Sequence, residues 1–196
     1  MYNLEALEQV KEKAIANKIP ILMDETLDEI LEILKEESPK EILEIGTAIG
    51  YSASQFAITI PGVHIDTIEL SEERANEARN NIKLIGTDSQ IDIFQGDAME
   101  ILPTFNKQYD VIYIDANKGK YPIYLQHAIR LSKVGTVILA DNVLYKGYVL
   151  GDYNKHKQRT AVKHLREYIA ETMSNERLET EILKIGDGLS ITRVIK

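Results

Sequence analysis

The chain has 196 residues, of which 44% are hydrophobic and 28% charged, and its formal net charge is −8 at pH 7. This size and composition predict one globular domain, and the acidic balance argues against a protein that coats nucleic acid with its whole surface. The absence of cysteine excludes disulfides, zinc–thiolate sites and thiol nucleophiles, and the lack of a long apolar run or signal peptide predicts a cytoplasmic protein with no membrane partner.

Two amphipathic helices are expected at the start, over residues 3–18 and 24–37, with Asp24 as the N-cap of the second. Beyond residue 40, apolar runs of strand length alternate with segments of helical periodicity. The strands are expected at 42–45, 64–69, 91–94, 109–115 and 136–140, and the helices at 51–60, 71–85, 97–102 (closed by Pro103), 121–131 and 158–173. This alternation predicts an α/β fold with a doubly wound, mostly parallel sheet. The tail, 180–185 and 189–194 around Gly186-Asp187-Gly188, predicts an antiparallel hairpin at its edge.

The segment from Glu41 to Ser54 combines a buried strand, a loop punctuated by Gly46 and Gly50, and the start of a helix. Such a unit can cradle a nucleotide. Ala48 and Tyr51 stand where a dinucleotide fingerprint has glycines, which argues against NAD and favours a nucleoside cofactor without a pyrophosphate, such as S-adenosylmethionine. Glu69 ends the next strand, where a carboxylate can accept hydrogen bonds from ribose hydroxyls. A simple tight turn is the alternative.

Acidic and amide side chains follow two later strands. Asp115 ends one strand, and Asp141-Asn142 ends the next. Because the carboxyl ends of parallel strands meet at one edge, we expect these three residues to converge. An oxygen-only ligand set suits Mg²⁺, with Mn²⁺ or Ca²⁺ possible, and the alternative is a helix cap beside a turn.

The basic residues are concentrated late in the chain. Residues 145–166 hold six lysines and arginines against the single acid Asp152. The segment can attract an anionic partner or can simply be a solvated helical face.

These motifs, in this order and spacing, resemble the cation-dependent O-methyltransferases, which include the catechol and caffeoyl-CoA enzymes. The resemblance rests on Glu44-Ile-Gly-xxx-Gly-Tyr-Ser, Ile68-Glu69, Gly96-Asp97-Ala98, Ile114-Asp-Ala-Asn-Lys118 and Ala140-Asp-Asn-Val143. It implies a Rossmann-like class I methyltransferase fold, with a seven-stranded sheet in a core over residues 40–196 and N-terminal helices over 1–37, as one domain. It also implies S-adenosylmethionine as the methyl donor.

The resemblance further implies roles for single residues. It assigns catalysis to Lys118 and metal ligation to Asp115, Asp141 and Asn142. The residues implied at the cofactor are Met23, Glu44, Gly46, Ser52, Glu69, Asp97, Ala98 and Asp115.

The region after the metal motif looks closest to the bacterial tRNA 5-hydroxyuridine methyltransferases. This likeness predicts tRNA as the substrate, with 5-hydroxyuridine methylated to 5-methoxyuridine. The residues expected to contact tRNA are Lys155, Lys157, Arg159 and Arg166.

Other functions remain open on the sequence alone. A small-molecule catechol or caffeoyl-CoA type methyltransferase is the main alternative, followed by an NAD-linked oxidoreductase and a catalytically silent nucleoside- or RNA-binding module. The two N-terminal amphipathic helices, together with the habit of the family, predict a homodimer.

Overall fold

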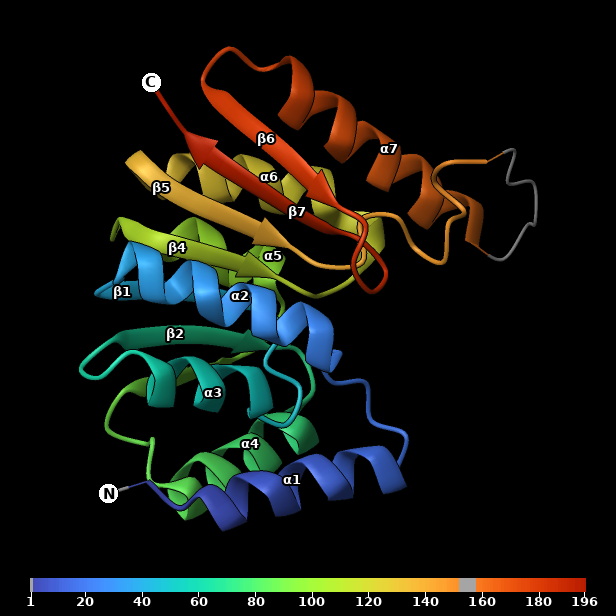
Figure 1. Ribbon diagram of the computed structural model, residues 1–196. Coiled ribbons are helices and arrows are strands. Elements are labelled where there is room, and N and C mark those ends of the chain that lie inside the picture. Colours follow the sequence, from blue (N-terminus) through green and yellow to red (C-terminus); the bar gives the residue numbers. More distant parts are fainter. Residues whose placement is uncertain (1, 152–157) are drawn as a thin grey trace. The chain divides into compact units, whose positions relative to one another are not determined.

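The computed structural model describes residues 2–151 and 158–196. Its chain divides into two units, Met1–Thr104 and Phe105–Lys196. The strands form a seven-stranded sheet in the order β3-β2-β1-β4-β5-β7-β6, so the predicted α/β architecture with a mostly parallel sheet is confirmed (Figure 1). Among the described residues, no helix combines the length and apolar composition that a membrane span requires.

The first unit alternates helices and strands as the hydrophobic pattern predicts. Its elements are α1 (Leu4–Ala16), α2 (Asp24–Glu37), β1 (Glu41–Ile45), α3 (Tyr51–Thr59), β2 (His64–Glu69), α4 (Glu72–Ile85), β3 (Ile91–Gln95), α5 (Ala98–Ile101) and the short 3-10 helix η1 (Leu102–Thr104). β2 lies between β1 and β3 and is parallel to both. Isoleucines on β1 and β2 are fully or almost fully buried, as near-continuous apolar runs in parallel strands require.

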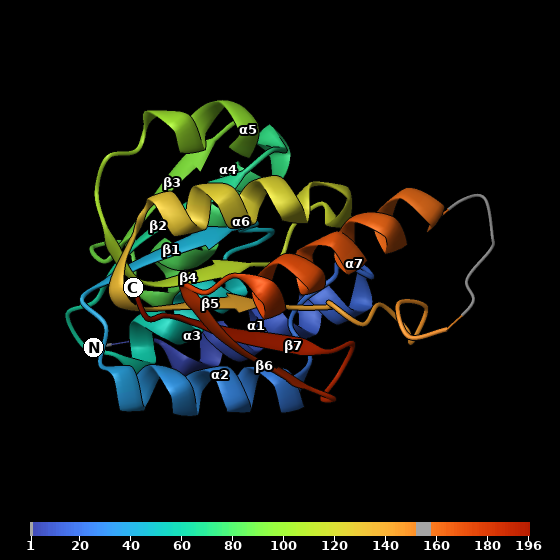
Figure 2. The same ribbon diagram turned by 90° about the horizontal axis from the view of Figure 1, so that it is seen from above.

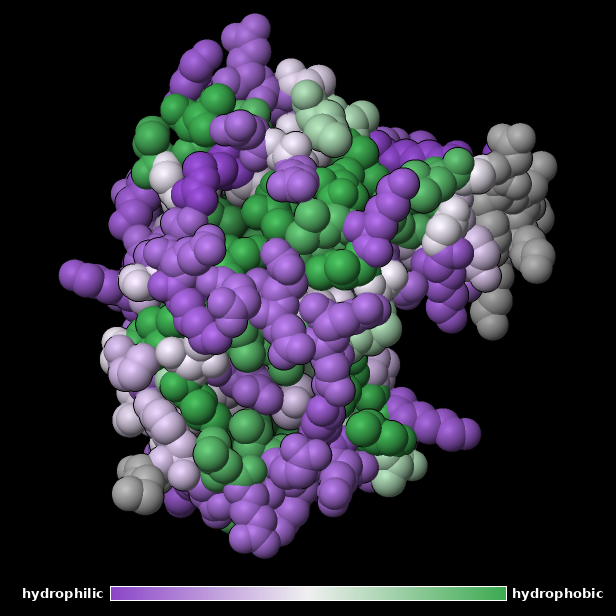
Figure 3. Space-filling model, viewed as in Figure 1, coloured by the Kyte–Doolittle hydropathy of each residue, from purple (hydrophilic) through white to green (hydrophobic). Residues whose placement is uncertain are grey.

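Helices α1 to α4 pack against one another in this unit. The apolar stripe of α2, including Leu27, Ile30 and Leu34, is buried, whereas its opposite side is charged and forms a hydrophilic band in Figure 3. Leu7 and Val10 of α1 are buried as well. Most of the apolar faces that suggested a homodimer are therefore used inside the unit, and the homodimer stays a prediction.

The second unit contains β4 (Tyr109–Ile114), the 3-10 helix η2 (Lys118–Lys120), α6 (Tyr121–Arg130), β5 (Ser132–Ala140), α7 (Arg159–Ser174), β6 (Leu178–Leu183) and β7 (Leu189–Val194). β4 and β5 are parallel, and β7 pairs antiparallel with both β5 and β6. The C-terminal hairpin is thus confirmed. Helices α6 and α7 pack side by side in this unit (Figure 2).

Three details differ from the sequence-based expectations. Met23 is the N-cap of α2, and Asp24 is its first residue, whose carboxylate lies 2.7 Å from the Lys11 ammonium. Pro103 lies inside η1, since a 3-10 turn continues the chain past α5. β5 begins at Ser132, four residues before the expected start at residue 136. The sequence pattern did not predict these residues because they are mostly exposed and carry no apolar alternation.

Candidate functional site

The loop after β1 is shaped by one carboxylate. Ala48 has a left-handed backbone (φ 47°), an uncommon conformation for a residue with a side chain. Its N–H donates to Oε2 of Glu69 at 2.8 Å, and the N–H of Ser71 donates to Oε1 at 2.9 Å. Each oxygen of Glu69 therefore keeps acceptor capacity for a further donor, as the predicted contact with ribose hydroxyls requires.

A buried carboxylate also contributes hydrogen bonds that hold the same loop. Glu44 is fully buried, and its two oxygens accept hydrogen bonds from the hydroxyls of Ser52 and Thr67, each at 2.5 Å. The Thr67 and Thr47 hydroxyls lie 2.6 Å apart. This network ties the end of β1 to the first turn of α3. In this geometry Glu44 holds the loop in place, and Ser52 contributes to this by donating its hydroxyl hydrogen bond to Glu44.

The end of β3 lies beside the end of β2. The Gly96 N–H donates to the carbonyl of Glu69 at 2.9 Å. Asp97 is exposed and caps α5 by accepting the Met99 N–H at 2.8 Å, whereas Ala98 is almost completely buried. The structure thus brings the Gly46 loop, Glu69 and Asp97 to one end of β1, β2 and β3.

Met23 makes no side-chain cap hydrogen bond at the start of α2. It precedes α2 with an extended backbone, and its side chain is exposed. Its contact with a cofactor stays a prediction.

In the second unit, two acids stand at the ends of adjacent strands. The N–H of Asp141 donates to the carbonyl of Ile114, so Asp141 lies next to the end of β4, which Asp115 follows. Asn142 follows with a left-handed backbone (φ 58°), and its N–H donates to Oδ1 of Asp141 at 2.6 Å. The three residues thus follow the ends of the adjacent strands β4 and β5, and their convergence on a metal stays a prediction.

These acids lie in surroundings that disfavour negative charge. Burial raises the pKa of Asp141 to about 7, and the nearby charge of Asp115 contributes to that rise. Burial also raises the pKa of Asp115, while the positive charge of Lys118 lowers it. Two carboxylates so arranged would be stabilised in their ionised form by a divalent cation.

The C-terminal hairpin holds the loop that begins at Asp141. Backbone N–H groups of Val143 and Leu144 donate to the carbonyls of Gly188 and Asp187, at 3.0 and 2.9 Å. The Tyr121 hydroxyl donates to the carbonyl of Asp141 at 2.7 Å. The turn of the hairpin and the first residue of α6 therefore fix the backbone around the two acids.

Lys118 opens η2, directly after the β4 end. Its ammonium lies 5.7 Å from the centre of the Tyr145 ring, a distance that allows a cation–π contact. Its positive charge opposes the rise that burial causes in the pKa of Asp115 and of Asp141. A cation in this position can hold a developing negative charge or handle a proton beside the two acids.

The basic segment divides into residues with different surroundings. Lys155 and Lys157 lie outside the described residues. Arg159 and Lys163 are exposed and lie four residues apart on α7. Nζ of Lys163 lies 3.6 Å from Oε1 of Glu167. Arg166 donates from its guanidinium to the carbonyls of Val149 (3.1 Å) and Gly151 (2.5 Å), so it anchors the loop after β5.

Several residues around Asp141 and Glu44 were not predicted from the sequence to belong to the site. Asp187 raises the pKa of Asp141 by its charge, yet in the sequence it marks only a turn between glycines. Thr47 lies in the loop after β1 and Thr67 lies inside β2, and neither belongs to a recognisable motif. Only the fold brings Thr67 to Glu44 and Thr47 to Thr67.

Known proteins are similar to this chain in sequence. Residues 1–195 match the family model described as O-methyltransferase. A catechol O-methyltransferase of Niastella koreensis is 37% identical over 165 residues, which cover 79% of this chain and 73% of that protein. A caffeoyl-CoA O-methyltransferase of Medicago sativa is 33% identical over 175 residues, covering 84% and 70%.

A solved structure has the same fold. It is an O-methyltransferase from Bacillus cereus in complex with SAH, with 28% sequence identity and a TM-score of 0.87. The match covers 97% of this chain and 90% of that one. The likeness therefore extends over both units.

Proposed function

The chain belongs to the O-methyltransferase family, and on that premise we propose that it transfers a methyl group from S-adenosylmethionine to an acidic hydroxyl with the help of a divalent cation. The observation that carries the cation dependence is the pair Asp115 and Asp141, whose raised pKa values reflect burial of two acids at neighbouring strand ends. An NAD-linked oxidoreductase and a silent binding module find no counterpart among these relatives.

The residues at the ends of β1 to β3 suit the methyl donor. Glu69 keeps acceptor capacity on both oxygens for the ribose hydroxyls, and the loop from Gly46 to Gly50 opens α3 without the glycines that a pyrophosphate needs. Asp97 is exposed and available to a polar ligand beyond its cap. The use of S-adenosylmethionine as the donor is supported by the SAH in complex with the Bacillus cereus relative.

Asp115, Asp141 and the side-chain amide of Asn142 would hold the cation. They supply only oxygen donors of the kind that Mg²⁺, Mn²⁺ or Ca²⁺ prefers. When bound, the cation would orient the acceptor hydroxyl and lower its pKa.

Lys118 would handle the proton of the acceptor hydroxyl. The acceptor oxygen forms a bond to the methyl carbon while the bond from that carbon to sulfur breaks, so the hydroxyl must lose its proton and the sulfonium becomes a neutral thioether. Lys118 can accept that proton as a neutral amine, or as an ammonium it can hold the negative oxygen until transfer. Positioning of the two reactants supplies much of the remaining rate.

Two acceptor classes remain to be separated. We propose 5-hydroxyuridine in tRNA, supported by Arg159 and Lys163, which are both exposed and lie one turn apart on α7. The named relatives favour a catechol or caffeoyl-CoA type acceptor instead. Both acceptors present a hydroxyl on a planar ring that ionises more readily than an alcohol.

The test combines metal removal with one substitution. Stripping the protein with EDTA should abolish methyl transfer from labelled donor to tRNA lacking the modification and to a catechol panel, and Mg²⁺ or Mn²⁺ should restore it. Asp141→Asn should lose activity yet bind S-adenosylmethionine as the parent does, since Glu69 and its loop lie in the other unit. Full activity after verified metal removal would contradict the cation dependence.

A further inference from the structure

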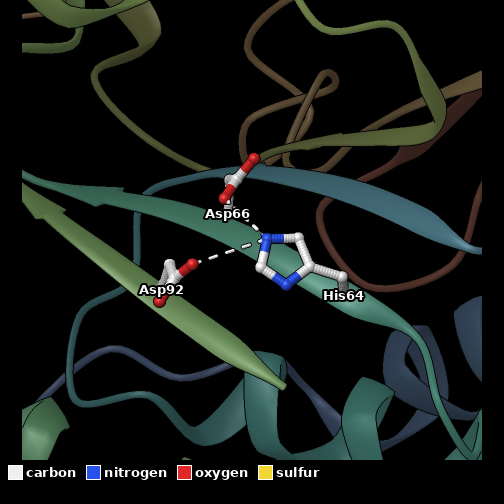
Figure 4. A group of neighbouring side chains, drawn as sticks. All are labelled: His64, Asp66 and Asp92. Atoms are coloured by element: carbon white, nitrogen blue, oxygen red, sulfur yellow. Dashed lines mark hydrogen bonds and ion pairs between the residues drawn. The ribbon is translucent and has the colours of Figure 1, made fainter. Parts of the chain in front are cut away.

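A second group of metal-type side chains lies on the first unit, away from the strand ends that carry Glu69 and Asp97. His64 and Asp66 belong to β2, and Asp92 belongs to the edge strand β3. Nε2 of His64 lies 3.0 Å from Oδ1 of Asp66 and 3.6 Å from Oδ2 of Asp92 (Figure 4). One potential ligand atom from each residue lies within 4.8 Å of the other two.

Strand register explains why these three meet. His64 and Asp66 are two residues apart, so they share one face of the sheet, and Asp92 is the register partner of Asp66. Glu41 of β1 is the register partner of His64 and adds another acid to this face. The arrangement is therefore built into the strands β2 and β3 and does not depend on a loop.

The ring nitrogen Nε2 of His64 lies close to carboxylate oxygens of both aspartates. A neutral imidazole carries one N–H, so Nε2 can donate well to Asp66 at 3.0 Å, while Asp92 at 3.6 Å is too far for a hydrogen bond. Two like charges directly opposite on adjacent strands destabilise a sheet. The Asp66 side chain is only 8% exposed, which increases the cost of its charge.

We propose that His64, Asp66 and Asp92 form a binding site for a divalent transition ion of the zinc class. One imidazole nitrogen and two carboxylate oxygens are ligands that Zn²⁺ accepts, and a neutral His64 with two aspartates carries the −2 charge that the ion offsets. With bonds of about 2.0–2.1 Å, ligand atoms around a tetrahedral zinc lie roughly 3.3–3.4 Å apart. The distances of 3.0 and 3.6 Å bracket that value.

The imidazole distinguishes this site from the oxygen-only set of Asp115, Asp141 and Asn142, which suits a harder cation. The site is also separate from the donor-binding end of β2, because His64 starts that strand and Glu69 ends it. At about 3.3 Å per residue, Asp66 lies about 10 Å and His64 about 17 Å along the strand from Glu69. The Asp92 side chain is 67% exposed, so the ion has access from solvent and a fourth position open to water.

The experiment measures Zn²⁺ binding by isothermal titration in excess Mg²⁺, which occupies the oxygen-only site. The parent protein should bind one equivalent of Zn²⁺, and the imidazole resonances of His64, assigned with His64→Gln, should shift on addition. His64→Gln and Asp92→Asn should each weaken binding by more than roughly 10-fold, the loss expected even for a residue that only supports a ligand.

Two control variants make the result specific. Asp88→Asn removes the same charge from an exposed position, and His127→Gln removes another imidazole; both should bind Zn²⁺ as the parent does. Absence of Zn²⁺ binding by the parent would overturn the proposal. So would binding that His64→Gln and Asp92→Asn leave unchanged, because the ion would then lie elsewhere.

Discussion

Single residues other than glycine take a left-handed backbone in both units. Ala48 is left-handed where glycine is the usual choice, a conformation that costs roughly 1–2 kcal/mol, and the hydrogen bond from its N–H to Glu69 offsets part of that cost. Asn142 is left-handed as well, and its N–H donates to Asp141. In each case an acid assigned to the site also holds the backbone of the loop beside it.

The role of Lys118 can be tested at this scale. Lys118→Ala should lower turnover by roughly 10²–10⁴-fold, the range for proton-handling groups, with little change in affinity for S-adenosylmethionine. If Lys118 takes the acceptor's proton, the loss should shrink as pH rises, because the hydroxyl then ionises without help. Turnover of both proteins should be measured across the pH range of activity.

The neighbouring Lys120 provides the control. Lys120→Ala removes an equal charge from the same short 3-10 helix and should leave turnover close to that of the parent. A loss on Lys118→Ala that does not vary with pH would instead assign Lys118 to positioning of the acceptor.

At the scale of elements, the sequence predicts what local pattern controls. The helix expected at 71–85 is present as α4, and Ser71 caps it through a local contact, because the capping side chain and the donor it binds are three residues apart. The docking of the hairpin turn at Gly188 against the loop at Val143 was not, because the two segments are remote in sequence and neither carries a local signal for the other. Likewise, the sequence suggested Arg166 as a substrate contact, whereas its guanidinium binds carbonyls of the loop after β5.

The hairpin turn gives a prediction for metal binding. Gly188 has a left-handed backbone (φ 93°), and a Cβ there would meet the Cβ of Leu144 at 2.8 Å. Gly188→Ala should therefore displace the loop that begins at Asp141, weaken Mg²⁺ binding and lower turnover at least about 10-fold, a loss of about 1.4 kcal/mol. Donor affinity, for which Glu69 and its loop lie in the other unit, should change little. Calorimetry with Mg²⁺ and with S-adenosylmethionine separates the two effects.

Gly147→Ala is the matched control, because Gly147 also has a positive φ (75°) but a Cβ there would meet nothing within 4 Å. Equal losses of Mg²⁺ affinity in both variants would attribute the effect to backbone strain and not to the contact between turn and loop.

The packing of α7 gives a prediction for alkaline stability. Tyr168 is fully buried, and burial raises its pKa to about 12 from the usual 10. Below pH 10 both the folded and the unfolded protein hold the proton. Between pH 10 and 12 the unfolded protein loses it first, so the free energy of unfolding falls as pH rises, by up to about 3 kcal/mol from this group.

Tyr168→Phe removes that contribution. The difference in the free energy of unfolding between parent and variant should be constant from pH 7 to 9 and should move in favour of the variant above pH 10. Urea unfolding at several pH values measures it. A difference that stays constant to pH 11 would show that the Tyr168 pKa is not raised.

At the scale of the whole chain, the open question is which acceptor the enzyme takes, and charge distribution is the property that bears on it. The protein is acidic overall, yet Arg159 and Lys163 are exposed at the start of α7. Contacts from such side chains to phosphates position a nucleic acid without reading its sequence. A small catechol has no phosphates, so these two side chains would not contribute to its binding.

Replacing Arg159 and Lys163 together by Ala should therefore separate the acceptors. Affinity for tRNA should fall, and its log–log dependence on salt should flatten by about one unit for each phosphate that the variant no longer neutralises. Methylation of a catechol should be nearly unchanged. The control removes the same charge from α4 with Arg74→Ala and Lys83→Ala, both exposed positions in the first unit, and should leave the salt dependence as it is. Equal reductions on tRNA and catechol would make the two residues structural. A parent protein that fails to bind tRNA at low salt would contradict the tRNA proposal and favour a small phenolic acceptor.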